Sequence, residues 1–254
     1  MTSDKEESIL RGHLEDLASE SYSFGKFTFT EFLGLRELAV YESVKPSLMY
    51  AGCREYGGAE DCERLMVRFG DEESLGYSVP FPIKLLRISP ASEKFAEQLT
   101  HRDILGAVMN LGIERDTIGD IIMHDGSAFL FAHERIAEHI IQNLTRASHT
   151  AVKVSATDSL PEGAGYSLVS ETVQVASERA DGVIAKVFRL NREDTQRLFS
   201  SARIFLNGKA EARADVRLRD GDKVTVRGFG RFIYRSYETL SRKGKLNARV
   251  ELYK

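Results

Sequence analysis

The sequence predicts an α+β protein of three small domains, on three observations. Its 254 residues exceed what one small core requires and suit two or three domains. Apolar spacing of helical period alternates with short strand-like runs along the whole chain. The C-terminal part is basic and the rest is acidic: residues 177–254 hold 19 Lys and Arg against 10 Asp and Glu, whereas residues 1–176 hold 16 Lys and Arg against 28 Asp and Glu. We expect the domains at residues 1–78, 79–160 and 177–254.

Residues 1–78 are predicted to form an N-terminal α+β domain. Gly25 is expected to end a charged amphipathic helix, and Thr30 is expected to cap the helix that follows, since a Thr hydroxyl can accept from the free amides of a first turn. Pro46 is expected to begin a new unit. The predicted helices span 2–20 and 28–40, and the predicted strands span 47–52 and 64–69.

Residues 79–160 are predicted to form a middle domain with the element order β-α-β-β-α-β. Two apolar runs flank Asp125-Gly126, a dipeptide that favours a tight β-hairpin turn. This order is typical of a ferredoxin-like or RNA-recognition-like sandwich. The aromatic signature with which such sheets bind RNA is missing, so we expect a structural or docking role for this domain. The predicted strands are 83–88, the two arms of 119–132, and 151–154, and the predicted helices end at Gly112 and span 133–144.

Residues 177–254 are predicted to form a basic C-terminal domain, in which a helix-turn-helix packs on a small antiparallel sheet. The turns of that sheet are expected at Asn207-Gly208 and Asp220-Gly221. Residues 155–176, which contain one proline and two glycines, are expected to connect this domain to the middle one. The predicted helices span 178–188 and 192–200, and the predicted strands span 203–209 and 223–227.

The composition of the chain limits the classes of protein to which it could belong. No stretch approaches the roughly 20 apolar residues of a membrane helix, and the N-terminus lacks the basic start and apolar core of a signal peptide. Cys53 and Cys62 stand without a CxxC, which favours a reducing cytoplasm and argues against structural zinc. We expect a cytoplasmic monomer with no cofactor and no metal. The basic module favours a polyanion such as nucleic acid, the alternative being a solvated basic surface without a partner.

An enzymatic alternative rests on the middle domain. His101-Arg-Asp103 is a local pair in which a carboxylate could orient an imidazole for general base catalysis. No GxSxG, Walker loop, dinucleotide-binding fingerprint or HExxH accompanies it. His133 and His139 are six residues apart on a predicted helix, a poor spacing for one metal ion. We therefore expect no catalytic residues, and keep an RNA-modifying or hydrolytic enzyme as the alternative.

The helix-turn-helix and strand pattern of the C-terminal part resembles the S-four domain, the RNA-binding module named after a small-subunit ribosomal protein. Asn191 stands where that family usually has Ser, and Ala202 where Gly is common. The matching residues are Arg179-Ala-Asp181, Val183-Ile184-Ala185, Leu190-Asn191-Arg192, Ile204, Leu206-Asn207-Gly208 and Gly221-Asp222.

A wider resemblance, over nearly the whole chain, is to the YlmH-type proteins. It implies an N-terminal domain, an RNA-recognition-like middle domain and a C-terminal S-four domain. It also implies a ribosome-associated factor that binds ribosomal RNA and tRNA and helps to rescue stalled large subunits carrying peptidyl-tRNA. A photosystem-related name in some relatives leaves an assembly factor as a further alternative. The resemblance is carried by Gly57 to Arg64, Thr100 to Asp103, Met109 to Gly112, Ile118 to Ile122, Arg227 to Arg231 and Arg242 to Lys245.

Ten basic residues are candidates for RNA contact, because Lys and Arg neutralise phosphates and Arg takes phosphate oxygens in a planar fork. Arg179 and Lys186 are seven apart and share a helix face, and the glycines within 227–231 permit a close backbone approach. The alternative for each is a surface ion pair, which for Arg179 would involve Asp181 or Asp222. The candidates are Arg179, Lys186, Arg189, Arg192, Arg197, Lys209, Arg227, Arg231, Lys243 and Lys245.

Overall fold

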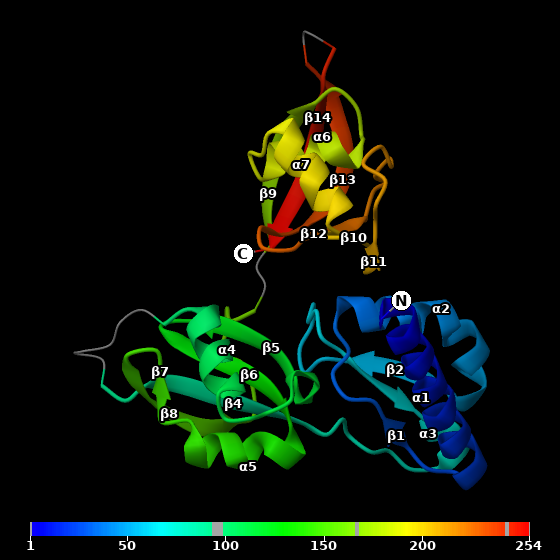
Figure 1. The fold of residues 1–254 in the computed structure, drawn as a ribbon, viewed down its shortest axis with the longest axis vertical. Coiled ribbons are helices and arrows are strands. Elements are labelled where there is room, and N and C mark those ends of the chain that lie inside the picture. Colours follow the sequence, from blue (N-terminus) through cyan, green and yellow to red (C-terminus); the bar gives the residue numbers. More distant parts are fainter. Residues whose placement is uncertain (1, 93–98, 166–167, 242–243, 254) are drawn as a thin grey trace. The chain divides into compact units, whose positions relative to one another are not determined.

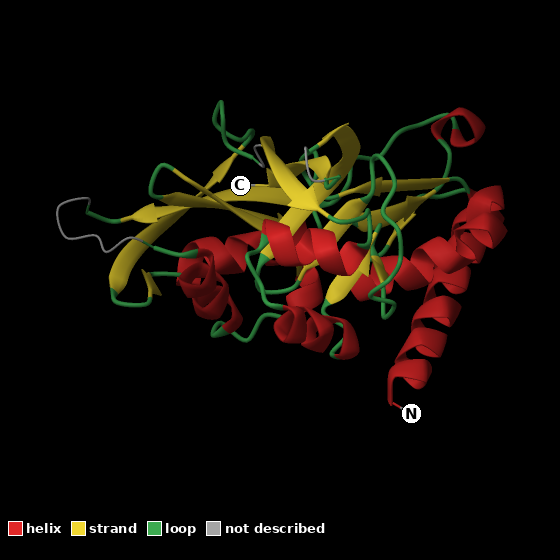
Figure 2. Ribbon diagram, turned by 90° about the horizontal axis from the view of Figure 1, so that it is seen from above, coloured by secondary structure: helices red, strands yellow, loops and turns green. Residues whose placement is uncertain are grey.

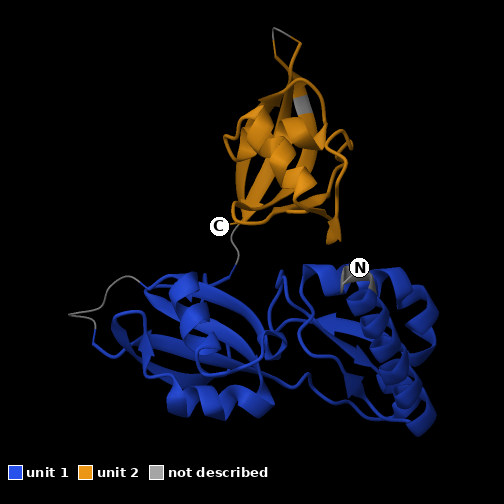
Figure 3. Ribbon diagram, in the orientation of Figure 1, with its two compact units in different colours: residues 1–165 blue, residues 166–254 orange. Residues whose placement is uncertain are grey.

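The computed structural model describes residues 2–92, 99–165, 168–241 and 244–253. The chain forms two compact units, residues 1–165 and residues 166–254 (Figure 3). Helices and strands are both abundant, as Figure 2 shows, so the prediction of an α+β protein is confirmed. None of the described helices is long and apolar enough to cross a membrane.

The N-terminal part of the first unit, residues 1–78, packs two helices on a three-stranded antiparallel sheet of order β1-β3-β2 (Figure 1). Its core joins Leu14 and Ala18 of the first helix to Tyr41 and Leu48 of the second. The elements are α1 (Thr2–Phe24), β1 (Thr28–Phe29), α2 (Leu35–Leu48), a 3-10 turn η1 (Met49–Ala51), β2 (Cys53–Tyr56), β3 (Met66–Phe69) and α3 (Glu72–Leu75).

Three expectations for this part are wrong. Residues 28–34 are not helical, and the Thr30 hydroxyl accepts from the backbone N–H of Val67 at 2.9 Å instead of capping a helix. Pro46 begins no new unit, because it lies in the last turn of α2, where burial of the helix's apolar face outweighs the helix-breaking tendency of proline. Residues 47–52 form the end of that helix and η1 rather than a strand.

The middle part, residues 79–165, contains the predicted order β-α-β-β-α-β and one additional short strand. All strands of its sheet pair antiparallel in the order β5-β6-β4-β8-β7. Asp125 and Gly126 both have positive φ, +44° and +70°, as the tight hairpin turn requires. The elements are β4 (Ile83–Pro90), α4 (His101–Met109), a 3-10 turn η3 (Arg115–Thr117), β5 (Ile118–His124), β6 (Ser127–His133), α5 (Glu134–Asn143), β7 (Arg146–Ala147) and β8 (Thr150–Thr157).

The two faces of this five-stranded sheet are covered differently. One face packs against α4 and α5, with Leu86 and Leu130 in the shared core. On the other face Phe129 and Phe131 are buried against Phe32 and other side chains of the N-terminal part. An RNA-recognition sheet stacks bases on aromatic side chains of its open face. Here the N-terminal part of the same unit covers the aromatic side chains of that face.

Two segments that carry the YlmH-type resemblance meet at this junction. The Asp120 carboxylate accepts from the backbone N–H groups of Glu63, at 2.6 Å, and Arg64, at 3.1 Å. The Arg64 side chain donates to the carbonyls of Ile118 and Phe32, both at 2.8 Å. A Cβ on Gly58, where φ is +105°, would lie 2.2 Å from the Phe131 ring, so only glycine fits there. The contact between the N-terminal and middle parts therefore depends on both segments.

The second unit is a six-stranded antiparallel sheet of order β11-β10-β12-β13-β14-β9, with α6 and α7 packed on one face. Both helices lie close to the predicted ranges. Val183, Ile184, Leu198 and Phe199 are their buried apolar residues. The elements are β9 (Leu168–Val175), α6 (Ala180–Val187), α7 (Arg192–Ser200), β10 (Ile204–Leu206), β11 (Lys209–Ala210), β12 (Lys223–Val226), β13 (Gly230–Leu240) and β14 (Leu246–Tyr253).

One segment of this unit differs from expectation. Residues 168–175 were expected within a connecting segment, but they form β9, which pairs with β14 from Leu168↔Tyr253 to Val175↔Leu246. Val175 is 3% exposed and belongs to the core beneath α6. The sequence of β9, LVSETVQV, is rich in β-branched residues that suit a strand, and pairing with the far end of the chain makes it an edge of the sheet.

Candidate nucleic-acid interface

The excess of positive charge belongs to the second unit. Residues 166–254 hold 19 Lys and Arg against 11 Asp and Glu, whereas residues 1–165 hold 16 against 27. The candidate RNA-binding residues of this unit fall into three places: the helix pair, the sheet face opposite the helices, and the two hairpins β10–β11 and β13–β14.

The helix pair presents Lys186, Arg189 and Arg192 to solvent. Arg192 begins α7, directly after Asn191, whose side chain caps the helix by accepting from the N–H of Asp194 at 2.7 Å. Asn191 thus completes the helix start, because its side-chain oxygen is as good an acceptor at this position as a Ser hydroxyl.

Two other arginines of the helix pair are held by carboxylates. Arg179 forms an ion pair with Asp181 at 2.7 Å, which is the alternative that the sequence left open for it. The Arg179 hydrogen bond, with a weaker contribution from the nearby charge of Arg192, lowers the pKa of Asp181. Arg197 pairs within its own helix with Asp194 at 2.7 Å. Both guanidinium groups stay partly exposed, so they can still contact phosphate.

Arg227 and Arg231 lie on the sheet face opposite the helices. Phe232 and Tyr234 point into the core beneath α6, and side chains alternate along a strand, so Arg231 points to the other face. Its guanidinium carbon lies 3.9 Å from the centroid of the Tyr253 ring, and that of Arg227 lies 5.0 Å from the centroid of Phe205. These arginines therefore stack on aromatic rings of the protein.

The remaining candidates lie in hairpins. Lys209 is exposed in the short edge strand β11, and Lys245 is exposed just before β14. Lys243 lies outside the described residues. The structure thus places Lys186, Arg189 and Arg192 on the helix pair, together with the ion-paired Arg179 and Arg197, and places the other described candidates on separate surfaces of the unit.

The middle part shows a structural role for the His101-Arg-Asp103 pattern. Thr100 and Asp103 form a reciprocal capping box at the start of α4, in which the Asp103 carboxylate accepts from the Thr100 hydroxyl at 2.6 Å and from the Thr100 N–H at 2.9 Å. The carboxylate is thereby committed to the helix start rather than to the imidazole. Among the described residues no group of three His, Cys, Asp or Glu side chains could hold a metal ion.

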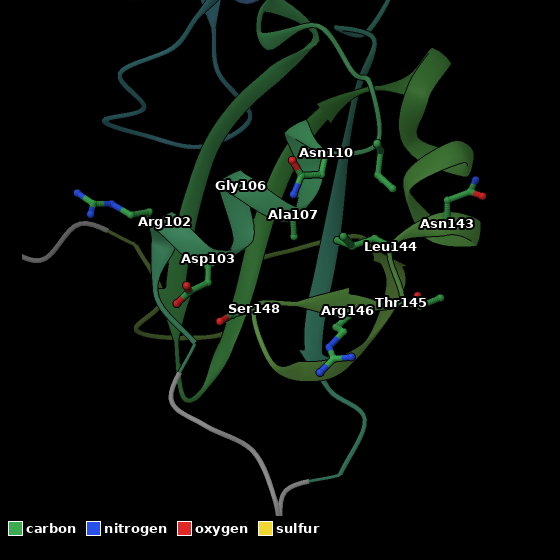
Figure 4. Close-up of a pocket in the computed structure, with 11 residues that line it drawn as sticks. Arg102, Asp103, Gly106, Ala107, Asn110, Asn143, Leu144, Thr145, Arg146 and Ser148 are labelled. Carbon is green, nitrogen blue, oxygen red and sulfur yellow. The ribbon is translucent and has the colours of Figure 1, made fainter.

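A pocket of about 460 Å³ lies beside this helix start, between α4 and the segment that follows α5 (Figure 4). Two arginines, Arg102 and Arg146, line it together with Asn110, Asn143 and Ser148. Cationic and amide donors suit phosphate and hydroxyl groups. This set is not evident in the sequence, since its members are separated in the chain and only the folding of β7 beside α4 brings them together.

Residues 78–160 match the family model of an RNA-binding domain in YlmH. The matched range covers the middle part and includes the pocket lined by Arg102 and Arg146. Two proteins are similar over more of the chain. The chain is 26% identical over 232 residues to ribosome-associated protein quality control protein P2 of Bacillus subtilis (strain 168), covering 90% of this chain and 88% of that protein. The solved cell division protein ylmH from Streptococcus pneumoniae is 20% identical and covers 60% of this chain and 92% of its own, with a TM-score of 0.47.

The family match and the similarity to the Bacillus subtilis protein support the YlmH-type family that the sequence resembles. The S-four character of the second unit stays a prediction. The middle part, for which the sequence predicted a structural or docking role, corresponds to a domain described as RNA-binding.

Proposed function

We propose that this protein is a non-enzymatic, ribosome-associated RNA-binding factor. In this proposal it binds ribosomal RNA and tRNA on the large subunit, and acts in the rescue or quality control of stalled large subunits that carry peptidyl-tRNA. The observation that carries the proposal is the basic second unit, in which exposed Lys186, Arg189 and Arg192 lie on one pair of helices. Similarity over 90% of the chain to a ribosome-associated quality control protein supports the ribosome as the partner.

Electrostatics explains how such a surface would work. Each phosphate neutralised by Lys or Arg releases condensed counterions, which supplies most of the affinity for RNA and makes it depend on salt. Folded RNA is recognised largely by shape, so a cationic helix pair with few base-reading groups fits this target. The pocket lined by Arg102 and Arg146 would provide a second RNA contact from the middle part.

The test uses the full chain and purified large subunits, with and without peptidyl-tRNA. Wild-type protein is expected to co-sediment with the subunits, more strongly when peptidyl-tRNA is present, with a slope of log affinity against log salt of about −3 to −6. A triple variant, Lys186→Glu with Arg189→Glu and Arg192→Glu, is expected to lose this association. Lys5→Glu with Arg11→Glu and Arg36→Glu, three exposed cations of the first unit, makes the same change of net charge and serves as the control.

Catalysis is tested separately. Ribosomal RNA and tRNA incubated with the protein are expected to keep their masses, because the proposal assigns no chemical step. A cleavage or mass increase that disappears on replacement of His101 and Asp103 by Ala would contradict the non-enzymatic assignment and favour an RNA-modifying or hydrolytic enzyme.

A further inference from the structure

The turn between β12 and β13 holds an aromatic ring in a fixed position at the surface. Arg227 to Gly230 form this turn, in which Gly228 has a φ of +85° and Gly230 a φ of +139°. The Arg227 N–H donates to the Arg203 carbonyl at 2.9 Å, and the Arg203 guanidinium donates back to the Arg227 carbonyl. A Cβ on Gly228 would lie 2.5 Å from that guanidinium, so the two glycines and Arg203 together define the shape of the turn.

Phe229, between the two glycines, is 46% exposed although its ring is well supported. Its centroid lies 6.1 Å from that of Phe188, at the end of α6, and Phe188 in turn lies 6.0 Å from the fully buried Phe232. The Arg203 guanidinium carbon lies 5.9 Å from the Phe229 centroid. The ring is thus anchored to the core on one side and open to solvent elsewhere.

The surroundings of this ring indicate what could cover it. Arg203 is exposed with its guanidinium beside the ring, and Arg189, also exposed, follows Phe188. An aromatic ring among cations suits a ligand that is both flat and anionic. Nucleic acid has this combination, because its bases present π faces and its backbone presents phosphates, and stacking of bases on aromatic side chains tolerates any sequence.

We propose that Phe229 is a stacking platform for an unpaired base of the bound RNA, with Arg203 and Arg189 facing the adjacent phosphates. This inference rests on the proposed RNA-binding function and adds a preference that charge alone cannot provide. A cationic surface binds paired and unpaired RNA alike, whereas a stacking ring favours RNA in which a base is free to leave the helix.

The test compares two RNA hairpins of the same length, one with a single bulged adenosine and one with a continuous stem. Phe229→Leu in the full chain keeps an apolar side chain but removes the ring. It is expected to weaken binding to the bulged hairpin about 5- to 100-fold. Binding to the continuous stem and the salt slope are expected to stay unchanged. Phe24→Leu, which changes a 74% exposed phenylalanine of the first unit, is the matched control.

A second readout reports stacking directly. With 2-aminopurine as the bulged base, wild-type protein and Phe229→Trp are expected to change its fluorescence on binding, and Phe229→Leu is not. Equal binding of the bulged hairpin by wild type and Phe229→Leu overturns the inference, as does an equal loss for both hairpins. If Phe229→Leu binds both hairpins normally yet loses large subunits, the ring contacts protein instead. A wild type that binds neither hairpin overturns the proposed function itself.

Discussion

Asp120 accepts a hydrogen bond of 2.6 Å from the backbone N–H of Glu63, 57 residues earlier in the chain. The same carboxylate accepts from the N–H of Arg64, and the Arg64 side chain donates a hydrogen bond to the carbonyl of Ile118. These contacts join the N-terminal and middle parts of the first unit. Burial, reinforced by the charge of the nearby Arg64, lowers the pKa of Arg115 in this junction to about 10, so Arg115 remains charged at neutral pH.

We expect Asp120→Asn to destabilise the first unit by about 2–3 kcal/mol, because an amide NH₂ would replace one oxygen that faces a backbone donor in a buried site. Chemical unfolding of the full chain measures this loss. The control is Asp125→Asn, which makes the same chemical change in the exposed hairpin turn. Asn tolerates the positive φ of that position as Asp does. That control should stay within about 0.5 kcal/mol of wild type. Equal stabilities of the two variants would contradict a structural role for Asp120.

The strand β9 should be required for the stability of the second unit. We expect a fragment of residues 177–254 to be less stable than one of residues 166–254 by at least about 2 kcal/mol, because removal of buried Val175 alone costs about that much. The shorter fragment also leaves the edge of β14 unpaired. Thermal melting of both fragments measures the difference, and indistinguishable melting temperatures would show that β9 contributes little.

Stability of the first unit should fall as pH decreases below about 6.5, the ordinary pKa of histidine. His133 caps α5 by accepting through Nδ1 from the N–H of Arg135 at 3.1 Å, which requires a neutral ring. Burial, together with the charge of Arg135, lowers the pKa of His133. The unfolded chain therefore takes up this proton first, so the stabilisation is present above pH 6.5 and is lost as pH falls through the folded-state pKa.

The variant His133→Asn tests this assignment, since Asn can cap a helix without titrating. We expect the wild type to lose about 1 kcal/mol more than His133→Asn between pH 7.5 and pH 5.5, which is the scale of one capping bond and of a charge at a helix N-terminus. Urea unfolding at the two pH values measures it. Parallel losses in both proteins would assign the pH dependence to other groups.

Arg192 and Arg231 should behave differently when each is replaced by Ala. Arg192 is exposed at the start of α7, so its loss should weaken RNA binding while the melting temperature stays unchanged. Arg231 stacks on Tyr253 within the sheet, so its loss should lower the free energy of unfolding by about 0.5–2 kcal/mol. Melting curves and RNA titrations of the two variants separate these effects, and a stable Arg231→Ala protein would contradict the packing role.

Elements with local signals can be predicted from the amino-acid sequence. The helices at 180–187 and 192–200, the hairpin at Asp125-Gly126 and the turn at Asn207-Gly208 were all predictable. Apolar periodicity and turn dipeptides act over a few residues, so the sequence shows them without knowledge of the fold. The unequal division of charge is likewise a property of the chain alone.

Other features depend on partners that are distant in the chain and are visible only in the folded protein. Residues 168–175 become the edge of the second unit's sheet because β14 pairs with them, and Thr30 accepts from Val67 because β1 lies beside β3. The candidate cations are divided between the helix pair and the opposite sheet face, since strand alternation directs Arg231 away from Arg192. Phe229 becomes an exposed platform only when Phe188 and Arg203 fold around it. In each case the deciding contact joins residues far apart in the chain, and local propensity does not show which distant residues will meet.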